Sequence, residues 1–206
     1  LPFVRYADDS MIFCKSKRAA MRVKESITRF IENTLYLKVN KEKTVMSYVR
    51  GVKYLGYSFY VMKGKCQLTV HPKSKAKMKS RLKELTSRSN GWGHAKRKQK
   101  LKEYIKGWVG YYHLANMKRL LLETDEWVRR RIRMCIWKSW KRVKTKVANL
   151  IRCGISKHKA YEWGNTRKGY WRIADSYILH RAITKEHLCR AGYATLMGAY
   201  LEWYPK

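Results

Sequence analysis

The dipeptide His71-Pro72 divides the chain, and this division constrains the fold more than any other feature of the sequence. Before it, short runs rich in β-branched and aromatic residues surround a single helical pattern. After it, every apolar pattern has helical spacing. Proline has no amide hydrogen, so it fits the first position of a helix. The sequence therefore predicts an α+β region over residues 1 to 71, followed by an all-helical region.

The first region is predicted to be an antiparallel sheet with one helix packed on a face. Lys63-Gly64 is a turn signal, and a second tight connection lies at Ala7-Asp8-Asp9. The order of hairpin, helix, strand and hairpin is typical of a small α+β layer. The strands are expected at residues 3 to 6, 10 to 14, 45 to 49, 54 to 61 and 66 to 70, and the helix at residues 18 to 35.

The second region is predicted to begin with an amphipathic helix whose inward residues are Met78, Leu82 and Leu85. The clearest periodicity runs from Val128 to Ile151 in steps of three or four, which predicts one long helix that ends near Gly154. Further helices are expected at residues 95 to 108, 156 to 163, 171 to 182, 185 to 191 and 194 to 203.

The chain is strongly basic, with 48 Lys and Arg against 14 Asp and Glu and a formal net charge of +34. Such self-repulsion is tolerated when a polyanion supplies the counter-charge, so nucleic acid is the expected partner. A charge run is ordinarily a solvated face. Here residues 73 to 103 hold twelve basic residues against Glu84 and Glu103, and residues 129 to 146 hold nine with no acid. This nearly uniform sign favours phosphate contact. The expected contacts are Lys73, Lys77, Arg81 and Arg88 along one helix, with Arg97, Lys98, Arg167 and Lys168.

Two other classes of protein are disfavoured by the sequence. No apolar run approaches the roughly 18 residues of a membrane-spanning helix, so no membrane partner is expected. The five cysteines form no C-x-x-C pair and no zinc spacing with the histidines, so we interpret them as reduced and the protein as intracellular. The first residue is Leu1 and not Met, and residues 1 to 6 already have the composition of a strand, which suggests that an N-terminal part is missing.

Asp8 and Asp9 are the most informative pair in the chain, because Asp occurs elsewhere only at 125 and 175. Aspartate is a favoured turn residue, and that reading stays open. The alternative is a metal site, since rigid carboxylates bind Mg²⁺ and leave positions for phosphate and water. Nucleotidyl transfer needs such ions near a triphosphate, and the flanking apolar strands would hold the pair in place.

Five blocks carry a resemblance to a known family. Tyr6-Ala7-Asp8-Asp9 resembles the Y-A-D-D box of reverse transcriptases. The palm block that follows in the intron-encoded branch of this family resembles the segment from Leu37 to Thr44. The family's F-L-G-F strand resembles the segment from Tyr54 to Phe59. Gly107-Trp108 with Tyr111-Tyr112 resembles the signature of the maturase-specific thumb region, and the segment from Asn165 to Arg172 resembles the tail. The chain is thus similar to the C-terminal part of a bacterial group II intron-encoded reverse transcriptase/maturase.

The resemblance implies an RNA-directed DNA polymerase that also binds its intron RNA and assists splicing and retrotransposition. It implies that Asp8 and Asp9 hold Mg²⁺ in a two-metal site, with Tyr6 and Ala7 supporting them. A third metal-binding Asp and the fingers, which hold the incoming deoxynucleoside triphosphate, lie upstream in the family, so we expect the isolated chain to be inactive. Group II intron RNA and an RNA template with a DNA primer are the implied partners, and the bacterial cytoplasm is the implied location.

The resemblance also divides the chain into three expected parts. Residues 1–71 are the end of the palm, residues 72–152 the helical thumb or maturase-specific region, and residues 153–206 a basic helical extension that binds nucleic acid. Leu55 and Gly56 are the implied primer grip, although a plain bulge explains the glycine nearly as well.

Several readings stay open. Asn40, Lys43 and Thr44 either support the palm or form a turn before a strand. Trp108, Tyr111 and Tyr112 either stack on bases or pack in the core, and the core reading is favoured for Trp108. The rival functions are an RNA-binding maturase module without chemistry and a general basic chaperone of folded RNA.

Overall fold

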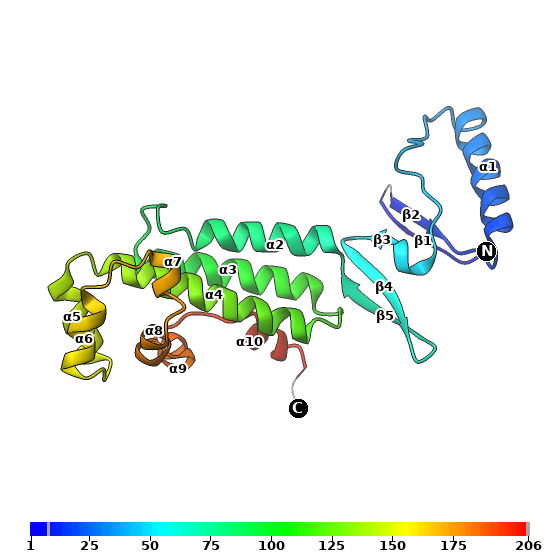
Figure 1. The fold of residues 1–206 in the computed structure, drawn as a ribbon. Helices are drawn as coiled ribbons and strands as arrows, with labels where there is room; N and C mark the ends of the chain where they lie inside the picture. Colours follow the sequence, from blue (N-terminus) through cyan, green and yellow to red (C-terminus); the bar gives the residue numbers. More distant parts are fainter. Residues whose placement is uncertain (8, 205–206) are drawn as a thin grey trace. The chain divides into compact units, whose positions relative to one another are not determined.

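The computed structural model of the chain describes residues 1–7 and 9–204. The chain forms two compact units, Leu1–His71 and Pro72–Lys206, and each is described here by itself. The first unit holds two small antiparallel sheets and a helix, and the second unit is helical (Figure 1). The predicted α+β class is confirmed, and its order of a sheet-containing part followed by a helical part is consistent with a partial palm and a helical thumb.

The first unit opens with a two-stranded antiparallel sheet and one helix. Strand β1 (Phe3–Tyr6) pairs with β2 (Asp9–Ile12), and Tyr6 lies opposite Asp9. Helix α1 (Lys17–Asn33) begins where the Ser16 side chain accepts a hydrogen bond from the amide of Ala19, an ordinary N-cap. None of the residues of α1 is buried.

The second sheet of this unit has the order β3-β4-β5. It contains β3 (Lys53–Tyr54), β4 (Tyr57–Met62) and β5 (Lys65–Val70), preceded by the 3₁₀ turn η1 (Val49–Gly51). Lys63 and Gly64 connect β4 to β5 with positive φ angles of 49° and 72°, as a two-residue hairpin turn requires.

The predicted strand over residues 45 to 49 is wrong. The segment is exposed and irregular until η1 begins, and it pairs with no described strand. Its β-branched residues gave it a strand-like composition, but β-propensity expresses packing against a neighbouring strand rather than a backbone preference. Without that neighbour, the chain runs directly from the turn at Thr44 into η1.

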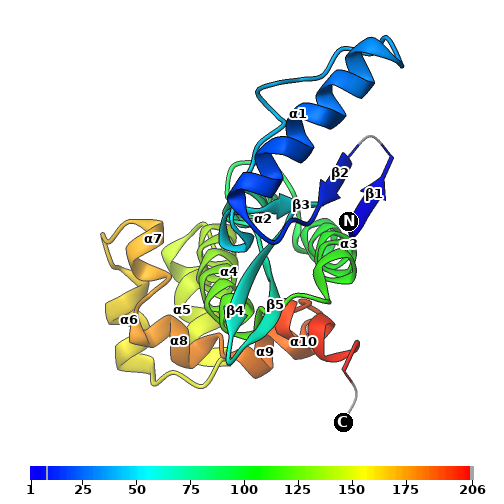
Figure 2. The same ribbon diagram turned by 90° about the vertical axis from the view of Figure 1, so that its right-hand side faces the viewer.

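Three long helices form the centre of the second unit: α2 (Pro72–Leu85), α3 (His94–Tyr112) and α4 (Lys118–Ser139). Their facing side chains are fully buried, among them Leu82, Leu101 and Leu121. Figures 1 and 2 show α2 on one side of α3 and α4, and the short helices α8, α9 and α10 on the other. The remaining helices are α5 (Val143–Arg152), α6 (Lys157–Gly164), α7 (Tyr170–Ile173), α8 (Tyr177–Ala182), α9 (Lys185–Arg190) and α10 (Leu196–Leu201).

The single long helix predicted from Val128 to Ile151 is wrong, because the helix stops at Ser139 and a new one starts at Val143. At the break, Trp140 leaves helical geometry with a ψ of 59°, and the hydroxyl of Ser139 donates to the carbonyl of Ile136 at 2.7 Å. The new direction lets α5 pack on α6. That contact is close: a Cβ atom at Gly164 would lie 2.6 Å from Val147 Cγ2.

The helix predicted over residues 171 to 182 is likewise divided into α7 and α8. Ser176 makes the division, because its hydroxyl donates to the carbonyl of Ile173 at 2.6 Å and accepts from the amide of Leu179 at 3.5 Å. The same side chain therefore closes one helix and caps the next. A serine hydroxyl that bonds to the backbone thus lies at each of the two interruptions.

Helix α10 is attached to α4 by a buried carboxylate. Asp125 is 4% exposed, and its two oxygens accept hydrogen bonds from the amides of Leu196 and Met197 at 2.8 and 3.0 Å. These amides belong to the first turn of α10, where backbone donors lack partners within the helix. Burial raises the pKa of the Asp125 carboxyl, and the two amides act against that rise. The Asp125 side chain therefore holds the last helix onto the bundle.

Candidate nucleic-acid interface

The acidic hairpin is built from β1 and β2. Asp9 is the first residue of β2 and is exposed, opposite Tyr6, which is 65% exposed. Ala7 has a φ of 51°, and its carbonyl accepts a hydrogen bond from Nε of Arg5 at 2.9 Å. Asp8, the other predicted ligand, lies outside the described residues. The hairpin therefore presents Asp9 at the start of a strand, where the ladder fixes its backbone.

A magnesium ion prefers oxygen ligands from a rigid frame, and the carboxylate of Asp9 on a paired strand meets both conditions. Over residues 1–7 and 9–204, no group of three or more His, Cys, Asp or Glu side chains could hold a metal ion. Asp125 and Asp175 have other partners in the second unit.

The predicted primer grip, Leu55-Gly56, is a hairpin tip and not part of a continuous strand. Tyr54 pairs with Tyr57, so the two residues between them are the loop that joins β3 to β4. Both have positive φ, 48° for Leu55 and 81° for Gly56, the combination of a type I′ turn. The strand expected over residues 54 to 61 is therefore divided by a turn. The amide of His71 donates to the Gly56 carbonyl at 3.0 Å and ties this tip to the end of β5.

Asn40, Lys43 and Thr44 form a local turn. The Asn40 side chain accepts a hydrogen bond from the amide of Lys43 at 3.1 Å, and the hydroxyl of Thr44 donates to the Asn40 carbonyl at 2.9 Å. One bond between residues far apart in the sequence joins the turn to α1: the ammonium group of Lys24 donates to the Thr44 carbonyl at 2.8 Å. These hydrogen bonds are those of a local turn, which is one of the two roles expected for the three residues.

The basic residues of α2 share one exposed side of the helix. Lys73, Lys77 and Arg81 follow each other at intervals of four and are exposed, whereas Met78 and Leu82 are fully buried. The helix therefore presents a cationic row away from the core. Arg81 also forms an ion pair with Glu84 at 2.7 Å, but both side chains are about half exposed, so the pair holds Arg81 weakly.

Arg97 and Lys98 both donate hydrogen bonds to other residues of the chain. Arg97 is 4% exposed and donates from Nη2 to the Ser87 carbonyl at 3.3 Å and to Asn90 Oδ1 at 3.2 Å. The prediction that Arg97 faces solvent is wrong, and it does not join the proposed phosphate contacts. Lys98 donates to the carbonyl of Ala191 at 2.8 Å, just after the end of α9. A cation there satisfies a carbonyl that a helix end leaves without a partner.

The fold brings Arg88 to the predicted basic loop in the last third of the chain. Its guanidinium lies 4.7 Å from the centre of the Tyr170 ring. Lys168 lies in the same loop, with its ammonium 4.7 Å from the Trp163 ring, and Arg167 is exposed. Arg88, Arg167 and Lys168 thus gather around the start of α7, although Arg88 precedes the loop by almost eighty residues.

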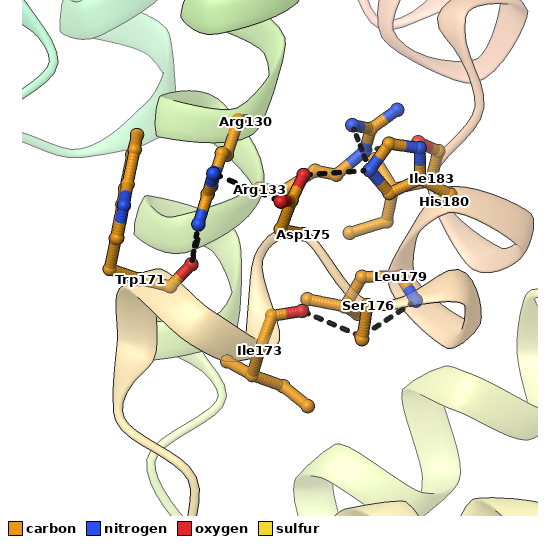
Figure 3. A network of polar contacts seen from close by, with 9 residues as sticks. All are labelled: Arg130, Arg133, Trp171, Ile173, Asp175, Ser176, Leu179, His180 and Ile183. Carbon is orange, nitrogen blue, oxygen red and sulfur yellow. Dashed lines mark hydrogen bonds and ion pairs between the residues drawn. The ribbon is translucent and has the colours of Figure 1, made fainter.

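A polar network around Asp175 was missed by the sequence analysis (Figure 3). Asp175 forms an ion pair with Arg130 at 2.9 Å, and its other carboxylate oxygen lies 3.5 Å from Nε2 of His180. The guanidinium of Arg130 also donates to the Trp171 carbonyl at 3.0 Å and lies 3.9 Å from the centre of the Trp171 ring. A signal was present, since Asp175 is a rare acid in a strongly basic half of the chain.

Comparison with known families supplies two matches. The sequence model of the reverse transcriptase (RNA-dependent DNA polymerase) matches residues 1–59, and that of the maturase-specific domain of group II introns matches residues 75–154. A search of curated proteins finds no match. Within the part of the chain that the structure describes, no helix has both the length and the apolar character needed to cross a membrane.

Proposed function

Because the chain belongs to the group II intron reverse transcriptase/maturase family, we propose that its first 71 residues are part of a polymerase palm and the rest is a nucleic-acid-binding thumb and extension. RNA-directed DNA synthesis is the activity of the reverse transcriptase family. The observation that carries the proposal is the presence of both matches in one chain, in the order palm and then maturase-specific domain. The proposed thumb covers residues 72–152 and the proposed basic extension residues 153–206.

In the proposed polymerase site, Asp8 and Asp9 are magnesium ligands. When bound there, magnesium would neutralise charge on the triphosphate and lower the pKa of the attacking hydroxyl of the primer. The β1-β2 ladder fixes the backbone of Asp9, and Tyr6 lies opposite it in the pairing. The tip formed by Leu55 and Gly56 is the proposed primer grip, where glycine leaves room for a nucleic-acid backbone. Asn40, Lys43 and Thr44 are proposed to support the palm through their turn.

The chain alone is proposed to bind nucleic acid without polymerising. Its four aspartates lie at 8, 9, 125 and 175, and the structure engages the last two inside the helical unit. A further metal-binding Asp is proposed to come from the upstream palm segment that the family resemblance implies. The proposed partners are group II intron RNA and an RNA template paired with a DNA primer, and deoxynucleoside triphosphates are the substrates of the complete enzyme. The bacterial cytoplasm is the proposed location, on the resemblance alone.

Primer extension on an RNA template with Mg²⁺ tests the polymerase half of the proposal. The chain alone is compared with the same chain fused to the fingers and upstream palm segment of a relative. We expect synthesis in the fusion only, and we expect Asp8→Ala or Asp9→Ala to abolish it. Full synthesis by the fusion that carries Asp8→Ala would refute the assignment of the metal site.

The salt dependence of RNA binding tests the thumb. Removing Lys73 and Arg81 together should weaken binding and flatten the plot of log affinity against log salt by about 0.7 to 0.9 for each lost phosphate contact. The matched control removes two exposed charges from α9, by Lys185→Ala with Arg190→Ala. An unchanged slope in the α2 variant, or an equal change in both, would refute the assignment of α2 as the phosphate-binding helix.

A further inference from the structure

Helix α7 carries two neighbouring aromatic rings that remain exposed. Tyr170 is 38% exposed and Trp171 is 40% exposed, while Ile173 on the same short helix is fully buried. The helix packs against α4, so its backbone is fixed to the centre of the second unit. The two large exposed rings are therefore held at a fixed place on the surface, as is typical of an interaction site.

Each ring has an arginine on one of its faces. The Arg130 guanidinium lies 3.9 Å from the centre of the Trp171 ring, and the Arg88 guanidinium lies 4.7 Å from that of Tyr170. In Figure 3 the Trp171 ring and the Arg130 guanidinium are seen edge-on and lie parallel. Both arginines come from parts of the sequence far from α7, so the tertiary fold creates the pairing.

Arg130 is held in this position by several bonds. Its guanidinium donates to the Trp171 carbonyl at 3.0 Å and forms an ion pair with Asp175 at 2.9 Å, and Asp175 also contacts His180 at 3.5 Å (Figure 3). A planar cation fixed by a carbonyl and a carboxylate loses little further freedom when another group binds nearby. The arginine thus orders the ring and leaves it partly accessible.

The charged and aromatic side chains around the two rings indicate which class of partner can bind there. Arg167, Lys168 and Arg172 are exposed within four residues of Trp171, so the partner must be anionic. It must also offer a flat face, because an exposed aromatic ring gains most from stacking. An unpaired nucleotide offers both a phosphate and a free base face, whereas the bases of a duplex are stacked on each other. An acidic protein would satisfy the charge and leave the rings unused.

We propose that Tyr170 and Trp171, backed by Arg88 and Arg130, form a stacking site for unpaired bases of a single-stranded nucleic acid. The inference rests on the proposed function, since it assumes that the chain binds nucleic acid, and it specifies the class of strand. Arg167 and Lys168 contact the phosphates that flank the stacked bases. Stacking of this kind tolerates any base, because every base has a π-face.

The test compares single strands with a duplex at one salt concentration. A 12-nucleotide RNA, the DNA of the same sequence and the corresponding RNA duplex are titrated with the 206-residue chain and with Trp171→Ala and Trp171→Phe. The alanine variant should lose about 5- to 150-fold in affinity for a single strand, the range found when one stacking aromatic is removed. Its affinity for the duplex should stay within about twofold, and phenylalanine should restore most of the loss.

A 2-aminopurine base in the single strand gives a second readout, because its fluorescence falls when it stacks. We expect a fall on binding to the native chain and a smaller fall on binding to Trp171→Ala. The RNA and DNA arms identify the strand: a loss in either one supports the site and names its ligand.

Unchanged single-strand affinity in Trp171→Ala, or an equal loss for single strand and duplex, would overturn the stacking site. In either case duplex binding that still depends on Lys73 and Arg81 would leave the proposed thumb function standing. Failure of the native chain to bind any of the three nucleic acids would instead refute the proposed function itself.

Discussion

The two units of this protein are stabilised in different ways. Among the described residues of Leu1–His71, only Ser58 and Val70 are buried, whereas Pro72–Lys206 buries the leucines and isoleucines of α2, α3 and α4. Large apolar side chains of the first unit, such as Phe3, Phe13 and Phe30, are about half exposed or more. The order of the first unit therefore depends on strand ladders and local turns, and the order of the second on a packed core.

The contrast between the two units shows that an apolar sequence pattern does not by itself bury the helix face that it predicts. Helix α1 has the periodicity of an amphipathic helix and forms where the pattern predicts it, yet none of its residues is buried. In α2 a weaker pattern leads to Met78 and Leu82 with no exposed surface at all. The period determines which residues share a face, and the neighbouring element determines what that face gains from burial.

The largest expected difference between the units is the response to loss of an apolar side chain. Leu101→Ala should destabilise the second unit by about 2–5 kcal/mol, because Leu101 is fully buried and leaves a cavity. Phe30→Ala removes a larger side chain from α1, but Phe30 is 55% exposed, so the expected loss is within about 0.5 kcal/mol. Native-state hydrogen exchange measures both variants. Equal losses would contradict the contrast between the units.

The second prediction concerns the buried carboxylate that holds α10. Asp125→Ala leaves two amides in the first turn of α10 without their acceptor, and each buried unsatisfied group costs about 1–3 kcal/mol. Asp125→Asn should lose less, because the amide oxygen still accepts one bond and burial already opposes the charge, as the raised pKa of the Asp125 carboxyl shows.

Tryptophan fluorescence during urea unfolding measures this loss, since all eight tryptophans lie in the second unit. Glu126→Ala is the matched control, because Glu126 is the exposed neighbour of Asp125 on the same helix. If the Glu126 and Asp125 variants unfolded at the same urea concentration, the attachment of α10 by Asp125 would be contradicted.

Much of this architecture was predictable, and some of the errors were avoidable. Arg97 was expected to face solvent because of its residue type, yet it lies four residues before Leu101 and eight before Ile105, both buried. Helical spacing alone places it on the buried face. Asp125 likewise lies four residues after Leu121 and three before Val128, both buried. For Arg97 the helical period was the better guide to burial, and the residue type misled.

Other features could not be read from local sequence. The break after Ser139 interrupts an unbroken apolar period, and it depends on a side-chain hydrogen bond and on the packing of α5 against α6. The pairing of Arg88 with Tyr170 and of Arg130 with Trp171 joins residues more than forty positions apart. Such contacts arise from the tertiary arrangement of helices, which spacing within one helix does not specify.

The third prediction uses the two hairpin tips of the first unit. Leu55 and Lys63 both have positive φ, 48° and 49°, which a side chain with a Cβ disfavours. Asparagine followed by glycine is preferred in a type I′ turn, so Leu55→Asn and Lys63→Asn should each stabilise their hairpin by about 0.5–1 kcal/mol.

Hydrogen exchange of the β4 amides measures this gain, and the two variants serve as controls for each other. Only Leu55 belongs to the proposed primer grip. In the active fusion described above, primer extension should therefore change with Leu55→Asn and not with Lys63→Asn. An equal effect of both variants on extension would count against the proposed primer grip.

The smallest expected effect is a pH dependence at the start of α3. Nδ1 of His94 lies 3.0 Å from the Tyr193 hydroxyl, and Nε2 lies 3.2 Å from the hydroxyl of Ser139. Burial, and then the charges of Arg97 and Lys98, lower the pKa of His94 below its ordinary value of 6.5. Burial raises the pKa of Tyr193 to about 12, so the tyrosine stays protonated while the histidine titrates.

The direction of the effect follows from proton linkage. The unfolded chain protonates His94 near pH 6.5 and the folded chain only at a lower pH, so the unfolded state binds more protons between these values. The stability that His94 contributes is complete above about pH 6.5 and is lost as the pH falls from there toward the folded pKa. Urea unfolding followed by tryptophan fluorescence at pH 7.5 and 5.5 measures the loss, and His94→Gln should make the difference between the two pH values smaller. A difference unchanged by His94→Gln would mean that other groups of the second unit cause it, and that the first turn of α3 does not sense pH.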